Sequence, residues 1–115
     1  MIYLASPYSH RDAVTREYRF REVCEVAARL MRSGHNVFSP IAHTHPIAQF
    51  GLPKEWDFWE KYDREFLAVC DAVWVLQING WKESVGVQAE IKIARELKKP
   101  VYFLRHGEIV PRDTE

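Results

Sequence analysis

The sequence predicts a single small doubly wound α/β domain over residues 1–115, in which helices cover both faces of a parallel sheet. Three observations indicate this fold. Short apolar runs alternate along the chain with longer segments of helical periodicity, which is the order of βαβ units. The runs are apolar throughout, as strands buried on both faces require. Prolines, glycines or polar residues close each run.

The first half of the chain holds two expected strands around a long helix. Residues 1–5 (MIYLA) form an apolar run whose place at the start of the chain suggests a central strand. Residues 11–32 repeat apolar side chains at helical spacing, and Gly34 follows as a helix stop. Residues 35–39 (HNVFS) give a second short strand. We expect residues 41–53, which contain prolines, a glycine and two histidines, to be a loop across the top of the domain.

The second half adds two helices and two strands. Helical periodicity covers residues 54–70 and again residues 84–97. Residues 72–76 (AVWVL) and 101–104 (VYFL) are apolar strands. Because crossovers between parallel strands are right-handed, these units predict a flavodoxin- or Rossmann-like sheet of four to five strands.

The composition narrows the class of partner. Sixteen basic and sixteen acidic residues cancel, so no net charge draws the chain to nucleic acid polymers or to anionic membranes, and a small molecule remains as the expected ligand.

Cys24 and Cys70 form no CxxC pair and lie among apolar neighbours, which indicates reduced thiols and a cytoplasmic protein. No P-loop or GxGxxG motif is present, so we expect no nucleotide cofactor. A zinc site at His43 and His45 would need a third ligand nearby, so we interpret them as polar loop residues and expect no metal.

Two acids, Glu90 and Asp63, interrupt the apolar faces of their helices. On a helical projection each acid shares its side of the helix with apolar residues or glycine. These companions are Gly86, Ile93, Ala94 and Leu97 for Glu90, and Trp56, Trp59, Phe66, Leu67 and Cys70 for Asp63. A buried carboxylate is costly unless it is hydrogen-bonded, paired or protonated, and burial can raise its pKa by up to about 3–5 units. We interpret both acids as candidate catalytic groups, with a structural acid bonded to a neighbouring loop as the alternative.

The predicted fold also gives the place of a site. Ligands bind outside the carboxyl ends of parallel strands where the strand order reverses, and residues 6–11, 40–45 and 77–86 meet at that edge. Ser84 can cap the following helix, and Gly86 in its first turn leaves room for a substrate oxygen near the backbone. The alternatives are a plain helix cap for Ser84 and close packing of helix on sheet for Gly86.

The chain contains, in this order, the motifs IYLASPYS, EKYDREFLAVCDAVWVL, SVGVQAE and KKPV. Together they resemble the nucleoside 2-deoxyribosyltransferase family and its relatives that hydrolyse 2′-deoxynucleoside 5′-monophosphates. The resemblance implies an enzyme in which Glu90 attacks C1′ of deoxyribose and Asp63 protonates the leaving base or orients the nucleophile. It also implies that Tyr8 stacks on the base or hydrogen-bonds near the nucleophile. The loop from Ser6 to Ser9 departs from the family pattern because it lacks the glycines common in relatives.

The implied reaction explains why two acids are needed. Breaking the bond between sugar and base builds positive charge on the sugar and negative charge on the base. A carboxylate at the anomeric carbon and an acid near the base therefore stabilise opposite ends. Retaining glycosidases work in this way through a covalent sugar ester, with carboxyl groups about 5–5.5 Å apart. A second base then accepts the sugar in a transferase, whereas water gives hydrolysis.

The resemblance and the predicted fold together give a set of candidate substrate-binding residues near the strand ends. They are Ser6, Ser9, Ser84, Gly86 and Trp81. Ser84 is similar to the serine of relatives that act on monophosphates, whereas several transferases acting on free nucleosides have an acid there. A serine beside a helix N-terminus suits a 5′-phosphate, with His10 or Arg11 as the cation, and serves a 5′-hydroxyl equally well.

The expected assembly is at least a homodimer. Many aromatic side chains lie on a small domain, and the resembling family completes its sites with a neighbouring subunit. Two other functions stay open at this point. One is a strict deoxynucleotide N-hydrolase, and the other is a non-catalytic nucleotide-binding or sensing module.

Overall fold

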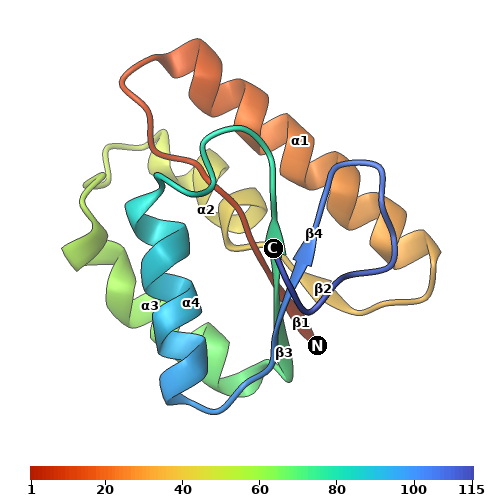
Figure 1. Ribbon diagram of the computed structural model, residues 1–115. Coiled ribbons are helices and arrows are strands. Elements are labelled where there is room, and N and C mark those ends of the chain that lie inside the picture. The colour runs from red at the N-terminus through yellow and green to blue at the C-terminus, as the bar shows by residue number, and fades with distance from the viewer.

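The computed structural model describes residues 1–115 as a four-stranded parallel sheet with helices on both faces (Figure 1). The strands are β1 (Ile2–Ala5), β2 (Val37–Phe38), β3 (Ala72–Leu76) and β4 (Val101–Leu104). They lie in the order β2-β1-β3-β4, and every neighbouring pair is parallel. The predicted doubly wound fold is therefore confirmed, and β1 is an interior strand as predicted.

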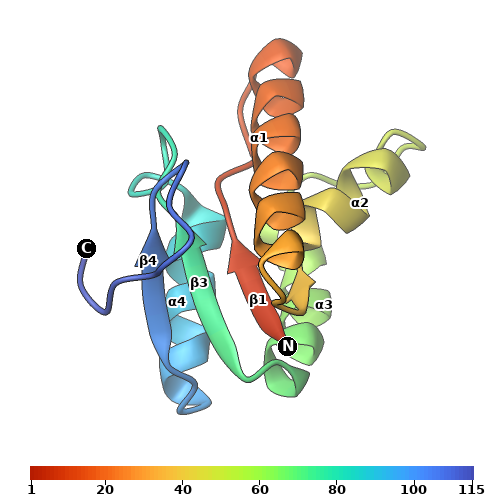
Figure 2. The same ribbon diagram turned by 90° about the vertical axis from the view of Figure 1, so that its right-hand side faces the viewer.

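The helices form two layers around this sheet. Helix α1 (Ala13–Arg32) covers one face, while α3 (Trp56–Val69) and α4 (Val85–Glu96) cover the other (Figure 2). Side chains alternate along β1, so Leu4 points to the α1 layer and Tyr3 points to the α3 and α4 layer. None of the helices combines the length and the apolar character that crossing a bilayer requires.

Helix α2 (Pro40–Ala48) lies where the sequence predicts a loop, so that part of the prediction is wrong. Two features start the helix. Pro40 takes its first position, where a missing N–H costs nothing, and Ser39 caps it by accepting a hydrogen bond from the Ala42 backbone N–H at 3.1 Å. Pro46 lies inside the helix and made the segment typical of a loop. The same cap shortens the second strand, because Ser39 is no longer available to it.

The site edge of the sheet lies between β1 and β3. The chain leaves β1 toward the α1 face and leaves β3 toward the α4 face, so the strand order reverses between them. Arg19 of α1 joins the two loops there, because its Nη1 donates to the Ser9 carbonyl at 2.9 Å and its Nη2 donates to the Asn79 carbonyl at 3.5 Å. Gly80 has a φ of +94°, and a Cβ at this position would overlap the guanidinium of Arg19. This position therefore favours glycine for its backbone conformation, and a larger residue would also displace the guanidinium of Arg19.

Candidate active site

Glu90 is the centre of the candidate site. It lies in the middle of α4, and the residue is only 4% exposed among the apolar side chains that face the sheet. The helix holds it there because Ser84 caps the first turn, accepting a hydrogen bond from the Val87 backbone N–H at 3.2 Å. The hydroxyl of Tyr3, from β1, donates a hydrogen bond to Oε2 of Glu90. A buried carboxyl group thus has one protein donor fixed on the central sheet.

Asp63 of α3 meets the same two groups. The residue is 9% exposed, and its carboxyl group lies within hydrogen-bonding reach of Glu90 and of the Tyr3 hydroxyl. The two predicted acids therefore converge from separate helices. Each carboxyl group shifts the pKa of the other, which suits two carboxyl groups that share a proton.

Burial dominates the electrostatics of this cluster. It raises the pKa of Glu90 well above the ordinary value, the nearby Asp63 charge raises this pKa further, and the hydrogen bond from Tyr3 lowers it. Burial also raises the pKa of Asp63 to about 6, against the lowering effect of hydrogen bonds with Glu90 and Tyr3. The pKa of Tyr3 is raised well above its ordinary value by burial and then by the two acids. Near neutral pH the pair of carboxyl groups therefore retains a proton that an exposed pair would lose.

An aromatic pocket of about 160 Å³ adjoins Asp63 between α2 and α3. Phe38 and Phe66 stack at one wall with ring centroids 4.2 Å apart and an interplanar angle of 19°. Asp63 is the only carboxyl group at its surface, and the other polar contributors are His43 and Thr44. The lining is Phe38, Pro40, His43, Thr44, Ile47, Leu52, Phe58, Trp59, Tyr62, Asp63 and Phe66. Flat apolar walls with one acid at the edge suit a planar heterocycle that accepts a proton.

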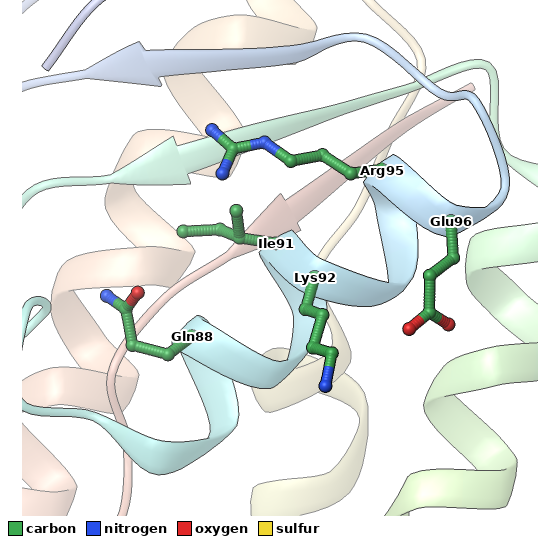
Figure 3. Close-up of a pocket in the computed structure, with 5 residues that line it drawn as sticks. All are labelled: Gln88, Ile91, Lys92, Arg95 and Glu96. Carbon is green, nitrogen blue, oxygen red and sulfur yellow. The ribbon is translucent and has the colours of Figure 1, made fainter.

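A second hollow lies on the outer side of α4 and is separate from this cluster. Figure 3 shows the five side chains that line it, all of them on α4. By helical spacing they all project at least a quarter turn away from Glu90. They are Gln88, Ile91, Lys92, Arg95 and Glu96. Four of the five side chains are charged or polar, and this hollow has no part in the candidate site.

The N-terminus of α4 offers a polar approach to the same edge. Gly86 lies in the first turn, where an added Cβ would meet only Ser84 Oγ, at 3.9 Å. Close packing therefore does not explain this glycine, and the space beside the backbone is open. At the end of β1, the Ser6 side chain is buried and its Oγ has no hydrogen-bond partner. An unpaired buried hydroxyl, and free N–H groups in the first turn of a helix, are both typical of places that receive a ligand oxygen.

Tyr8, Trp81 and Ser9 make their hydrogen bonds and ring contacts with groups other than the two acids. The Tyr8 hydroxyl hydrogen-bonds to Nδ1 of His45 and not to Glu90, so the phenol that contacts Glu90 is Tyr3. Trp81 packs against Phe103 with ring centroids 5.8 Å apart. Ser9 is exposed and contributes its backbone carbonyl to Arg19.

Among the groups that reach the two acids, Tyr3 was missed in the sequence because it sits inside an apolar strand. One signal could have revealed it. A tyrosine in the centre of a fully buried strand needs a partner for its hydroxyl, and the partner must come from a helix packed on that face. Arg19 was missed as well, because its helical position showed only an amphipathic pattern.

Two comparisons with known proteins give a match. A family model described as "Domain of unknown function (DUF1937)" matches residues 1–106. A search of curated proteins finds no match. The chain is similar to the solved structure of a 2-deoxyribosyltransferase from the psychrotolerant bacterium Bacillus psychrosaccharolyticus, described as a biocatalyst for the synthesis of nucleosides. The similarity has a TM-score of 0.60 and 28% identity, and it covers 95% of this chain and 75% of that chain. It supports the family that the sequence motifs resemble.

Proposed function

The chain belongs to the family described as a domain of unknown function, DUF1937, and we propose that it cleaves the N-glycosidic bond of 2′-deoxyribonucleosides or their 5′-monophosphates. Glu90 acts as the nucleophile, and the deoxyribosyl group passes to a second base or to water. The observation that carries the proposal is the buried cluster of Glu90, Asp63 and Tyr3 beside an aromatic pocket. Its likeness in fold to a 2-deoxyribosyltransferase supports the same reaction class.

The first step transfers the sugar to Glu90. A carboxylate oxygen of Glu90 forms a bond to C1′ while the bond from C1′ to the base nitrogen breaks, and its electron pair leaves with the base. Asp63 supplies the proton that the departing base needs. In the second step an incoming base nitrogen, or water, bonds to C1′ and the ester bond to Glu90 breaks. The attacking group gives its proton back to Asp63, so both acids return to their starting state.

The shared proton gives each acid its role. In the free protein the two carboxyl groups share a proton, because burial raises the pKa of both. Positive charge that develops on the sugar favours the ionised form of Glu90, and the hydrogen bond from Tyr3 favours it further. The proton therefore moves toward Asp63, which borders the pocket where the base would lie. Because Glu90 and Asp63 lie close together and share one proton, Glu90 can act as the nucleophile and Asp63 as the acid at the same pH.

The remaining contacts concern the rest of the substrate. The aromatic pocket holds the base by stacking, with Asp63 at its edge. The N-terminus of α4, with Ser84, Gly86 and Ser6, receives the 5′-oxygen or a 5′-phosphate. Arg19 lies across the adjoining loops and adds positive charge at this edge. This cation comes from α1, in addition to the predicted candidates His10 and Arg11.

A direct assay tests the proposed reaction. The protein is incubated with 2′-deoxynucleosides and with their 5′-monophosphates, each with and without a second free base, and the products are separated by chromatography. Release of free base in buffer shows hydrolysis, and formation of the second nucleoside shows transfer. Ribonucleosides serve as the matched control, because a 2′-hydroxyl would crowd Glu90. Neither product from any deoxynucleoside or deoxynucleotide would contradict the proposal and leave a non-catalytic binding module.

A further inference from the structure

Three polar side chains outside the acid cluster form a hydrogen-bonded chain. Tyr8 lies in the loop after β1, His45 in α2 and Glu17 in α1. The Tyr8 hydroxyl is 2.6 Å from Nδ1 of His45, and Nε2 of His45 is 2.8 Å from Oε2 of Glu17. Three segments far apart in the sequence are thus joined through one imidazole ring.

The imidazole of His45 is held in a single orientation. The residue is buried, and its ring stacks on Phe20 with centroids 4.3 Å apart and an interplanar angle of 29°. The Tyr8 ring meets it edge-on at 5.4 Å. Rotation of the ring would break both hydrogen bonds and the stack, so the two nitrogens have fixed partners. A buried histidine fixed so closely in a short surface helix indicates a positioning role.

The partners determine where the protons lie. Glu17 is half-exposed at the far end, and as a carboxylate it can only accept, so Nε2 of His45 carries the proton. When the ring carries this single proton, its Nδ1 accepts the hydrogen bond that the Tyr8 hydroxyl donates. As a result the Tyr8 oxygen has its proton directed toward His45 and presents its lone pairs as acceptors, with the Gln49 side chain as a neighbouring donor that lowers the Tyr8 pKa. The hydrogen bonds from Tyr8 through His45 to Glu17 thus make the Tyr8 oxygen, which could otherwise donate or accept, an acceptor only.

The position of this acceptor relates it to the proposed site. Tyr8 follows Ser6 and Pro7 at the carboxyl end of β1, and it is only partly buried. Helix α2, which carries His45, also forms a wall of the aromatic pocket through His43 and Thr44. Helices α1 and α2 pack against each other at this end of the sheet (Figure 2). The hydrogen-bonded chain therefore fixes the first loop relative to the pocket wall.

We propose that Glu17 and His45 are positioning residues that hold the Tyr8 oxygen as a hydrogen-bond acceptor for the 3′-hydroxyl of the substrate's deoxyribose. The inference rests on the proposed function, since it assigns a substrate contact within the same site. The 3′-hydroxyl is the donor that every 2′-deoxynucleoside or its 5′-monophosphate carries on the sugar, and an acceptor-only partner selects for it. Glu17 and His45 do not touch the substrate, so their effect passes through Tyr8.

The test compares two substrates across a variant series. On a 2′-deoxynucleoside, Tyr8→Phe, His45→Phe and Glu17→Ala are each expected to raise KM by about three- to tenfold with little change in kcat, as expected for one lost hydrogen bond. Glu17→Gln keeps an acceptor for Nε2 and should restore KM. On the matching 2′,3′-dideoxynucleoside, all variants should have the KM of the wild type. Glu25→Ala, an exposed acid on the same helix, is the control and should change neither substrate.

Two outcomes would overturn the proposal. An equal KM change on both substrates would show that Tyr8 contacts the base or shapes the pocket. An unchanged KM for His45→Phe and Glu17→Ala would show that they do not position Tyr8.

Nitrogen-15 NMR of the His45 ring tests the hydrogen bonds from Tyr8 to Glu17 without any turnover, so it is independent of the proposed function. We expect the Nε2-protonated neutral tautomer in the wild type and a mixture in Glu17→Ala, and an Nδ1-protonated ring in the wild type would contradict the proposal.

Discussion

Replacing Glu90 with glutamine is expected to abolish turnover and to make the protein more stable at neutral pH. Glutamine keeps the size of the side chain and an oxygen for the Tyr3 hydroxyl, but it cannot form the ester with C1′. We expect kcat to fall by about 10⁴-fold or more, as for loss of other enzyme nucleophiles. Stability should rise because an ionisable group fully enclosed in the core is replaced by a neutral one.

The pH dependence of this stability follows from the direction of the pKa shift. The pKa of Glu90 is raised in the folded state, so its favourable contribution is complete at pH values below the unfolded pKa and is lost as the pH rises through the folded one. The wild type should therefore lose thermal stability between pH 5 and 8 more steeply than Glu90→Gln. Calorimetry across this range measures the difference. Glu96→Gln, on the exposed side of α4, is the control and should change neither activity nor the pH slope. Full turnover by Glu90→Gln would contradict the nucleophile assignment.

Asp63→Asn is expected to lower kcat by about 10²- to 10⁴-fold, the range for loss of a general acid. The defect should depend on the leaving group. A purine base needs a proton to depart, whereas a nitrophenolate leaves as a stable anion without one. On a nitrophenyl 2-deoxyriboside the variant should therefore recover most of the wild-type rate. Steady-state kinetics with both substrates measure this, and an equal loss on both would show that Asp63 only orients Glu90.

The Asp63 variant also changes the pH profile. The pKa of Asp63 is raised to about 6 and that of Glu90 is raised well above its ordinary value, so the proton that the pair shares, and that a departing base needs, is lost on the alkaline side of this region. The wild-type kcat should fall on this alkaline side, and the fall should be absent in Asp63→Asn.

The same pKa shift makes the folding stability depend on pH. The protonated Asp63 contributes its full stabilisation below the unfolded pKa of 3.8 and loses it above about 6, so Asp63→Asn should be more stable than the wild type at pH 8, by at most about 3 kcal/mol. Asp57→Asn, an exposed acid of the same helix, should have no such effect.

The sequence predicts most of the fold because this sheet is buried on both faces. Strands of this kind are apolar without interruption, so the bounds of β3 and β4 agree with the predicted runs, and the helices between them show clear periodicity. Helix α2 was missed for a local reason. Its prolines suggest a loop, whereas Pro40 at the first position and the Ser39 cap in fact start a helix.

The candidate site was predictable only in part. Asp63 and Glu90 could be found because an acid in an apolar stripe is conspicuous in one helix taken alone. Their closeness in space could not be predicted, since it depends on how α3 packs against α4. Tyr3 was hidden because a tyrosine in an apolar strand does not interrupt the pattern. The hydrogen bonds from Tyr8 through His45 to Glu17 require α2 to be a helix, so the sequence pattern, which indicates a loop there, does not predict them.

The central claim is that Glu90 carries the deoxyribosyl group during the reaction. The most direct measurement is mass spectrometry of the protein quenched in acid during turnover of a 2′-deoxynucleoside, followed by digestion to locate the adduct. The account predicts one added deoxyribosyl group on the peptide that contains Glu90, and its absence in Glu90→Gln. A deoxyribosyl group on Asp63, or base release at the wild-type rate by Glu90→Gln, would contradict it.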